Sequence, residues 1–151
     1  MGGRKPRKNQ VVVENLQSRI RLRQKAIVSA TRKVLARLGY RKTTLSLVFV
    51  SDRKIKQLNQ RFLRHNWPTD VLAFPLKEKD YLGEVIISPE RARVQAKAYE
   101  TPFGEELFRY ICHGVLHLSG YSDKLEREKR RMRRAEDKLI KLVLTPRTRM
   151  V

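Results

Sequence analysis

The sequence has a single cysteine, Cys112, among its 151 residues. One cysteine excludes an internal disulfide, which is typical of a protein kept in a reducing cytoplasm. No apolar stretch approaches the roughly 18 residues needed to cross a bilayer. The first eight residues, Met1-Gly-Gly-Arg-Lys-Pro-Arg-Lys8, lack the apolar region of a secretory signal. We therefore expect a cytoplasmic protein without a membrane partner, in which Cys112 is a small buried residue.

Acidic residues are also scarce relative to basic ones: 15 Asp and Glu stand against 35 Lys and Arg, for a net charge of +20. A small cytoplasmic protein with this balance most often binds nucleic acid, whose phosphates release counterions when they are neutralised. A surface adapted to high temperature is the alternative, since 33% of the residues are charged. That alternative explains many charges of both signs but not the excess of one sign, so a nucleic-acid partner is favoured.

The hydrophobic pattern predicts one domain of alternating strands and helices. Val, Ile and other β-branched residues predict strands over residues 11–15, 43–50, 71–74 and 82–87. Helical spacing predicts helices over residues 22–38, 51–62, 89–99, 104–118 and 124–144. Ser51, Ser88-Pro89 and Thr101-Pro102 are interpreted as helix starts. We expect Leu125, Met132, Ala135, Leu139 and Val143 to be the buried residues of the last helix.

These elements predict an α+β fold: a single domain with a small mixed sheet of about four strands covered by helices. Residues 1–10 are expected to form a flexible basic arm, residues 11–144 the folded domain and residues 145–151 a flexible tail. The helix over residues 104–118 is expected to be central, because it carries the candidate metal ligands.

The candidate metal site is the stretch His113-Gly-Val-Leu-His117-Leu-Ser-Gly120-Tyr-Ser-Asp123. His113 and His117 are four residues apart, so both imidazoles lie on one face of a helix. Gly120 favours the left-handed conformation that ends a helix and turns the chain back. Asp123 then returns to the same place as an oxygen ligand. Two imidazoles, one carboxylate and an open fourth position are typical of a catalytic zinc site, so we expect one Zn²⁺ per chain.

The two histidines do not belong to the apolar face of their helix. On a wheel of about 100° per residue, they share one side with Glu106 and Arg109. The opposite side collects the apolar residues Leu107, Phe108, Ile111, Val115 and Leu118. The ligand spacing resembles the metallopeptidase pattern H-E-x-x-H-x-x-G-x-x-H, but Gly114 occupies the place of the general-base Glu. A peptidase is therefore a disfavoured alternative.

Three segments are similar to motifs of the YbeY family of metal-dependent endoribonucleases. Leu58-Asn59 with Pro68-Thr-Asp-Val-Leu-Ala-Phe-Pro75 resembles L-N…P-T-D-V-L-S-F-P. Gly83-Glu-Val-Ile-Ile-Ser88 resembles G-D-I-x-I-S, and His113–Tyr121 matches H-G-x-L-H-L-x-G-Y, the most specific of the three. The resemblance covers roughly residues 11–143.

The resemblance implies a cytoplasmic bacterial enzyme that binds zinc and hydrolyses single-stranded RNA. It further implies work on ribosomal RNA at the small ribosomal subunit, including maturation of the 16S rRNA 3′ end and ribosome quality control. We expect a monomer, although the sequence does not determine the oligomeric state.

The sequence departs from the family pattern at two positions. Asp123 stands where the family usually has its third histidine, so its negative charge offsets part of the charge of the metal. Leu63 stands where the family carries an arginine thought to contact substrate. Arg64, at the predicted start of a loop, is our candidate for that contact, and Arg61 is the reserve.

The sequence leaves the chemistry partly open. No general base stands at a diagnostic spacing, and the nucleophile is either an activated water or the 2′-OH of the RNA. A non-catalytic RNA-binding or ribosome-assembly protein with a structural metal is a second alternative, because it explains the charge equally well. His65 is a minor candidate for a ligand, and Trp67 is either a base-stacking residue or a packed loop anchor.

Overall fold

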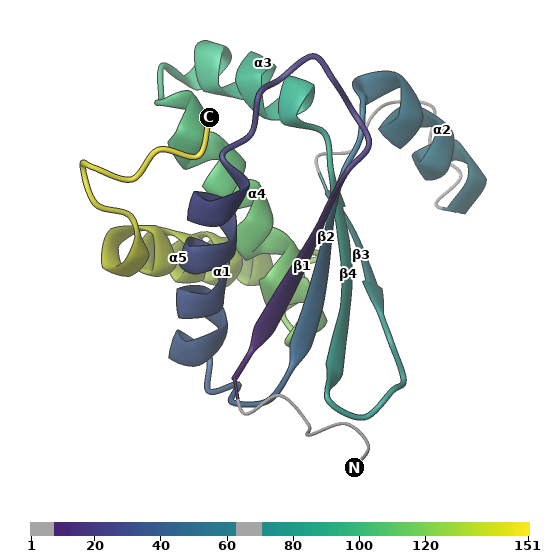
Figure 1. Cartoon of the computed structure of the whole chain (residues 1–151), viewed down its shortest axis with the longest axis vertical. Coiled ribbons are helices and arrows are strands. Elements are labelled where there is room, and N and C mark those ends of the chain that lie inside the picture. The colour runs from purple at the N-terminus through teal and green to yellow at the C-terminus, as the bar shows by residue number, and fades with distance from the viewer. Residues whose placement is uncertain (1–7, 63–70) are drawn as a thin grey trace.

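The computed structural model describes residues 8–62, with Phe62 by its backbone alone, and residues 71–151. Its centre is a four-stranded sheet with the strand order β1-β2-β4-β3 (Figure 1). β1, β2 and β4 are parallel, and β3 runs antiparallel beside β4. The predicted α+β domain with a small mixed sheet is confirmed. In chain order the elements of the described residues are β1 (Gln10–Asn15), α1 (Gln24–Arg37), β2 (Thr44–Phe49), α2 (Asp52–Phe62), β3 (Val71–Pro75), β4 (Tyr81–Ile87), α3 (Pro89–Tyr99), α4 (Phe103–Leu118) and α5 (Glu126–Val143).

The helices cover the two faces of the sheet unequally. α1 and α4 pack against one face, and α5 packs against both of them (Figure 1). Along β2, Leu45 and Leu47 point into this larger core, whereas Val48 points to the opposite face, where Ile55 of α2 covers it. This alternation follows from the two-residue period of a strand. Burial of each large aliphatic side chain contributes about 1.5–3 kcal/mol, so the larger core provides most of the stability. In the part of the chain that the structure describes, no helix is both long and apolar enough to cross a membrane.

The central helix α4 is buried on several sides. Leu107, Ile111 and Val115 contact the larger core, and Cys112 is fully buried as expected. Burial raises the pKa of the Cys112 thiol, and the nearby Glu136 raises it further. Cys112 is therefore a neutral thiol that contributes to packing.

Two glycines allow α4 to approach the sheet closely. A Cβ at Gly114 would collide with the side chain of Val85 in β4 and lie 3.1 Å from Cγ1 of Val71 in β3. A Cβ at Gly83 in β4 would lie 2.5 Å from the carbonyl oxygen of Phe74 and 2.8 Å from Cδ2 of Leu118. The carboxyl-terminal half of α4, which carries both histidines, is thus pressed against β3 and β4.

The helix starts agree with the sequence at two of three places. Ser51 accepts a hydrogen bond from the Lys54 amide at 3.1 Å, and Ser88 accepts one from the Arg91 amide at 3.2 Å. The prediction that Thr101 caps α4 is wrong, because Pro102 occupies the N-cap position without a side-chain cap. The Thr101 hydroxyl instead donates to Glu106 at 3.4 Å.

The last helix starts later than expected. α5 begins at Glu126, and Leu125 is its N-cap residue. The prediction that Leu125 is buried is therefore wrong, since its exposed fraction is 52%. Lys124 and Leu125 belong to the connection that follows Asp123.

The segment predicted to be a flexible tail, residues 145–151, includes one residue of the larger core. Met150 is 2% exposed and belongs to the larger core. Its carbonyl oxygen accepts a hydrogen bond from the Arg23 amide at 2.8 Å, just before α1 begins. A single methionine next to the C-terminus has no periodic neighbours, so the sequence pattern contained no sign of this contact.

Candidate metal centre

The end of α4 turns the chain back toward the two histidines. Gly120 adopts the left-handed conformation with a φ of 102°, as predicted. The Tyr121 amide donates to the carbonyl of Leu116 at 2.9 Å, and the Gly120 amide donates to that of His117 at 3.1 Å. This pair of bonds is the Schellman arrangement that commonly ends a helix at glycine. It directs residues 121–123 back along α4, so that Asp123 reaches the histidines.

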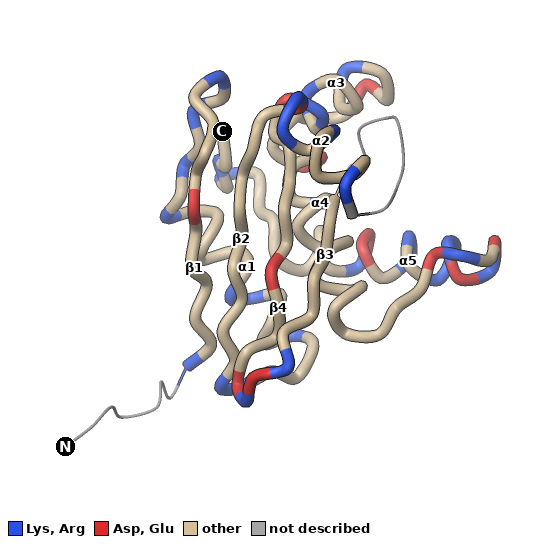
Figure 2. The backbone as a smooth tube through the Cα atoms, turned by 90° about the vertical axis from the view of Figure 1, so that its right-hand side faces the viewer, with Lys and Arg blue, Asp and Glu red and all other residues tan. Residues whose placement is uncertain are grey.

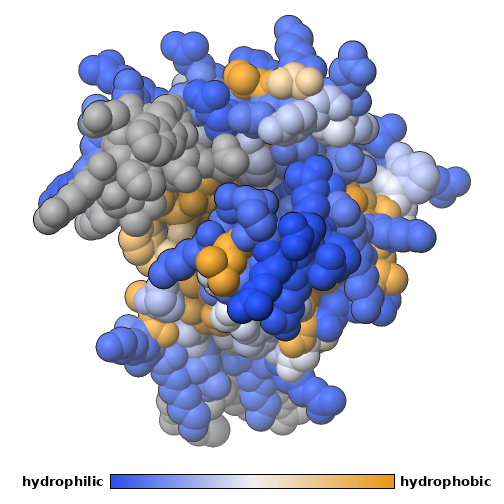
Figure 3. Space-filling model, turned by 180° about the vertical axis from the view of Figure 1, so that it is seen from behind, coloured by the Kyte–Doolittle hydropathy of each residue, from blue (hydrophilic) through white to orange (hydrophobic). Residues whose placement is uncertain are grey.

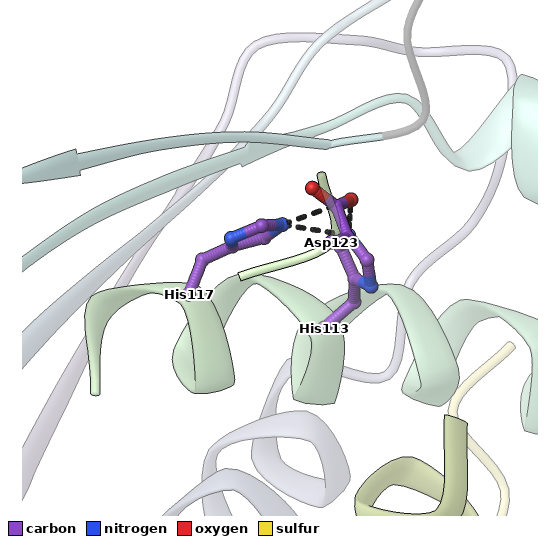
Figure 4. A group of neighbouring side chains, drawn as sticks. All are labelled: His113, His117 and Asp123. Atoms are coloured by element: carbon purple, nitrogen blue, oxygen red, sulfur yellow. Dashed lines mark hydrogen bonds and ion pairs between the residues drawn. The ribbon is translucent and has the colours of Figure 1, made fainter. Parts of the chain in front are cut away.

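His113, His117 and Asp123 converge on one point (Figure 4). The two Nε2 atoms of the histidines are 3.0 Å apart. Oδ2 of Asp123 lies 3.3 Å from Nε2 of His117 and 3.5 Å from Nε2 of His113. For a tetrahedral ion with bonds of about 2.1 Å, the ligand atoms lie roughly 3.4 Å apart. The three side chains can therefore hold one metal ion without a large rearrangement.

A buried carboxylate orients His113 from behind. Nδ1 of His113 lies 2.7 Å from Oε2 of Glu136 in α5, whose side chain is 5% exposed. A carboxylate at this distance favours the tautomer with the proton on Nδ1. That tautomer leaves the lone pair of Nε2 directed at the point shared with His117 and Asp123.

Arg109 compensates the charge of this carboxylate. Its Nη1 lies 3.1 Å from Oε1 of Glu136, and its Nη2 lies 2.8 Å from Oδ1 of Asp137. Burial alone would lower the pKa of Arg109, but its hydrogen bonds to Asp137 and Glu136 outweigh that effect and raise the pKa above its ordinary value. The guanidinium thus stays charged and fixes Glu136 against His113.

A cavity of about 440 Å³ opens beside these residues between α3, α4 and α5. Its lining includes His113, Asp123 and Glu136, together with exposed side chains of α3 and α5. The side chains of His113 and His117 are 26% and 29% exposed. A molecule bound in the cavity can therefore directly reach the point on which the three side chains converge.

The other sequence candidates lie elsewhere. Arg61 is an exposed residue in the last turn of α2. Arg64, His65 and Trp67 lie outside the described residues. The structure therefore brings together the three predicted ligands, while the predicted substrate contact of Arg64 stays a prediction.

Glu136 and its partner Arg109 were not identified as functional residues from the sequence. The available sign was the position of Glu136 among the apolar residues Met132, Leu139 and Val143, on the buried side of a helix that is otherwise basic. A carboxylate at such a position must find a charged or hydrogen-bonding partner in the interior.

Gly114 also argues against a metallopeptidase. A glutamate there would place its Cβ into Val85, on the side of α4 that faces the sheet. The position that carries the general base in the peptidase motif thus has no room for any side chain.

Comparison with known proteins gives a match over nearly the whole folded region. The family model described as Endoribonuclease YbeY matches residues 12–143. A protein of Thermodesulfovibrio yellowstonii named Endoribonuclease YbeY is 35% identical, over 86% of this chain and 94% of its own length. A protein of the same name from Phocaeicola vulgatus is 35% identical, over 81% of this chain and 89% of its own length.

A solved structure agrees with these matches. The solution structure of a Thermotoga maritima protein superposes with a TM-score of 0.62 at 27% identity, over 88% of each chain. The family model covers the candidate ligands His113, His117 and Asp123 together with Glu136. From the extent of these matches, the chain belongs to the YbeY endoribonuclease family.

Proposed function

We propose that this protein is a zinc-dependent endoribonuclease that cuts single-stranded RNA. The observation that carries the proposal is the convergence of His113, His117 and Asp123 within 3.0–3.5 Å of one another, next to an open cavity. Two imidazoles and one carboxylate form a typical ligand set for catalytic zinc. The name Endoribonuclease carried by the relatives supports RNA as the substrate.

The residues of the site have separate roles in this proposal. His113, His117 and Asp123 hold the ion, which when bound supplies Lewis-acid stabilisation of charge on a phosphodiester. Glu136 keeps the proton of His113 on Nδ1, and Arg109 holds Glu136 in place through an ion pair. Asp123 brings one negative charge to a position where the family usually has a neutral imidazole. The ion and its three ligands together therefore carry a smaller net positive charge.

The surroundings of the three ligands support a catalytic role over a structural one. A structural zinc site is closed by four protein ligands, whereas a catalytic site keeps one position free. Within residues 8–62 and 71–151, no fourth His, Cys, Asp or Glu joins the cluster. His113 and Asp123 also line a cavity that is open to solvent, which a non-catalytic assembly protein would not require.

We further propose that ribosomal RNA is the substrate, with maturation of the 16S rRNA 3′ end and ribosome quality control as the processes served. The net charge of +20 supports an RNA-rich partner such as the small ribosomal subunit. A monomer that acts in the cytoplasm completes this proposal. Arg64 is proposed to contact the substrate phosphate, with Arg61 as the alternative.

The proposal is tested by metal analysis paired with RNA cleavage. The purified protein is stripped of metal and reloaded with zinc. One equivalent should be retained, and cleavage of a single-stranded RNA should return with it, while a duplex of the same sequence stays intact. His113→Ala with His117→Ala, and separately Asp123→Ala, should lose most of the zinc and reduce cleavage more than about a hundredfold, because direct ligands contribute more than the 10–100-fold typical of their supporting residues.

Two results would overturn the proposed function. Cleavage by the metal-free double variant at the rate of the parent would show that the two histidines are not part of the active site. Tight RNA binding without cleavage by the zinc-loaded protein would favour the non-catalytic RNA-binding alternative. A peptide substrate serves as a control, and it should remain uncut under all conditions.

A further inference from the structure

We propose that a basic groove between α3 and α5 binds the single-stranded RNA that leads into the metal centre. This inference rests on the proposed endoribonuclease function and names a binding surface for its substrate. The groove, called here the α3–α5 groove, is lined on its outer part by Tyr99 from α3 and by Lys129, Arg130 and Arg133 from α5.

The α3–α5 groove is continuous with the metal centre. The same cavity is lined by the partly buried His113 and Asp123 and by the exposed Tyr99 and Arg130. Its volume of about 440 Å³ lies within the roughly 300–1,000 Å³ of sites that enclose small organic ligands. A cavity of this size accommodates one unpaired nucleotide beside the metal point, but not a duplex.

α5 supplies an unusual surplus of positive charge to this groove. The helix carries eight Lys or Arg and four Asp or Glu, and it extends away from the sheet (Figure 2). Two of the four acidic residues, Glu136 and Asp137, are paired with Arg109. Figure 3 shows the face of the molecule opposite to the one in Figure 1, and hydrophilic residues gather near its centre. Most of the charge on α5 is thus available to a polyanion.

Arg130 and Arg133 are the best placed of these cations. They are three residues apart, so they project from the same side of α5, and both are exposed. No carboxylate among the described residues forms an ion pair with either of them. Lys129 is paired, among the described residues, only with Glu126, at 3.4 Å on the surface, and such exposed pairs are weak. Guanidinium groups bind phosphate oxygens in a bidentate way, which suits two successive phosphates of one strand.

Tyr99 provides an aromatic surface at the other side of the groove. It is the last residue of α3, and 62% of it is exposed. Proteins that bind single strands combine a basic groove with exposed aromatic rings on which bases stack. Arg130 and Arg133 opposite Tyr99 reproduce this combination at the entrance to the metal centre.

The test measures binding separately from cleavage. The probe is a fluorescently labelled ten-nucleotide oligouridine, and binding is measured with metal removed so that the strand stays intact. Arg130→Gln with Arg133→Gln should weaken binding about tenfold or more. The slope of log K against log salt should also become shallower by roughly 0.7 for each phosphate that the variant no longer binds. Tyr99→Ala should weaken binding about tenfold with an unchanged slope, whereas Tyr99→Phe should bind like the parent.

A matched variant separates the groove from general charge. Arg127→Gln with Arg134→Gln removes the same charge from exposed positions of the same helix that do not line the cavity. It should weaken binding no more than about twofold. The proposed α3–α5 groove would be overturned if both double variants weakened RNA binding equally, or if neither variant weakened it. If the parent cuts RNA while the groove variants bind normally, this inference alone fails; if the parent neither binds nor cuts RNA, the proposed function fails.

Discussion

Glu136 links the interior of the protein to the candidate metal centre. Its Oε2 lies 2.7 Å from Nδ1 of His113, and its Oε1 lies 3.1 Å from Nη1 of Arg109. Carboxylates that bind the second nitrogen of a ligand histidine fix its tautomer and raise its basicity, and their loss typically lowers metal affinity 10–100-fold. Under the proposed function, Glu136 acts on the bound metal through His113 rather than by contact.

Two substitutions of Glu136 should weaken zinc binding to different extents. Glu136→Gln keeps an oxygen that can accept the Nδ1 proton but lacks the charge, so we expect a loss of about tenfold. Glu136→Ala removes the acceptor as well, and we expect a loss closer to a hundredfold. Zinc affinity is measured by competition with a chromogenic chelator, on protein whose folding has been checked by circular dichroism.

A purely structural role for Glu136 would give a different pattern. Both variants would then lower the free energy of unfolding of the metal-free protein, while the zinc affinity of the folded fraction would equal that of the parent. Arg109 keeps its bond to Asp137 in both variants, so the guanidinium is not left without a partner.

The predictable part of the site was the part that depends on local geometry. The proximity of His113 and His117 follows from their spacing on a helix, and the return of Asp123 follows from the left-handed Gly120. The contact of Glu136 spans 23 residues and depends on how α5 packs against α4. No local rule determines that packing, so the sequence could indicate at most that a carboxylate lies on a buried face.

At the scale of elements, the close packing of α4 on the sheet determines where the ligands lie. Gly114 stands between the two ligand histidines and faces Val85 of β4 and Val71 of β3. Any side chain at Gly114 would force α4 away from the strands. Asp123 follows α4 after a short turn, so a displacement of the helix also changes the spacing of the ligand atoms.

Gly114→Ala should therefore destabilise the protein despite a better helix propensity. Alanine is favoured over glycine in a helix by about 1 kcal/mol, but overpacking of a core costs about 1–3 kcal/mol. The collision should prevail, because Val85 is fully buried and has a short side chain that cannot move aside. Denaturant unfolding should show a net loss of up to about 2 kcal/mol, together with weaker zinc binding.

Gly104→Ala is the matched control in the same helix. Its new Cβ would lie 3.9 Å from Cγ2 of Val151, an ordinary contact, so its stability should stay equal or rise by less than about 1 kcal/mol. Val85→Ala combined with Gly114→Ala should recover part of the zinc affinity. Equal unfolding free energies for Gly114→Ala and the parent would show that α4 does not need this close approach.

The order and types of the helices and strands followed from the hydrophobic periodicity of the sequence, whereas the start residues of some helices did not. The start of α5 at Glu126 rather than Lys124 and the absence of a Thr101 cap are local choices between neighbouring polar residues. Such choices depend on the contacts of the connection, as in the bond from Thr101 to the buried Glu106. The exposed Leu125 has the same origin, since an apolar residue before the first turn need not face the core.

At the scale of the whole molecule, the C-terminal segment closes the larger core beside the start of α1. Met150 is buried among residues of that core, and the Arg23 amide donates to its carbonyl at 2.8 Å. The C-terminal segment thus contacts the residue that precedes α1. The segment should matter for stability and not for the site.

Met150→Ala should lower the free energy of unfolding by about 2–5 kcal/mol, the range observed when a buried methionine or leucine is truncated. Met150→Leu, which conserves volume, should cost less than about 1.5 kcal/mol. Leu142→Ala is the control for loss of a large apolar side chain, because Leu142 is 46% exposed, and it should change stability much less. Zinc affinity should be unchanged in all three folded variants, since neither Met150 nor Leu142 lines the cavity at the metal centre. If Met150→Ala unfolds at the same denaturant concentration as the parent, residues 145–151 are the flexible tail that the sequence suggested, and the packing of Met150 contributes nothing to the fold.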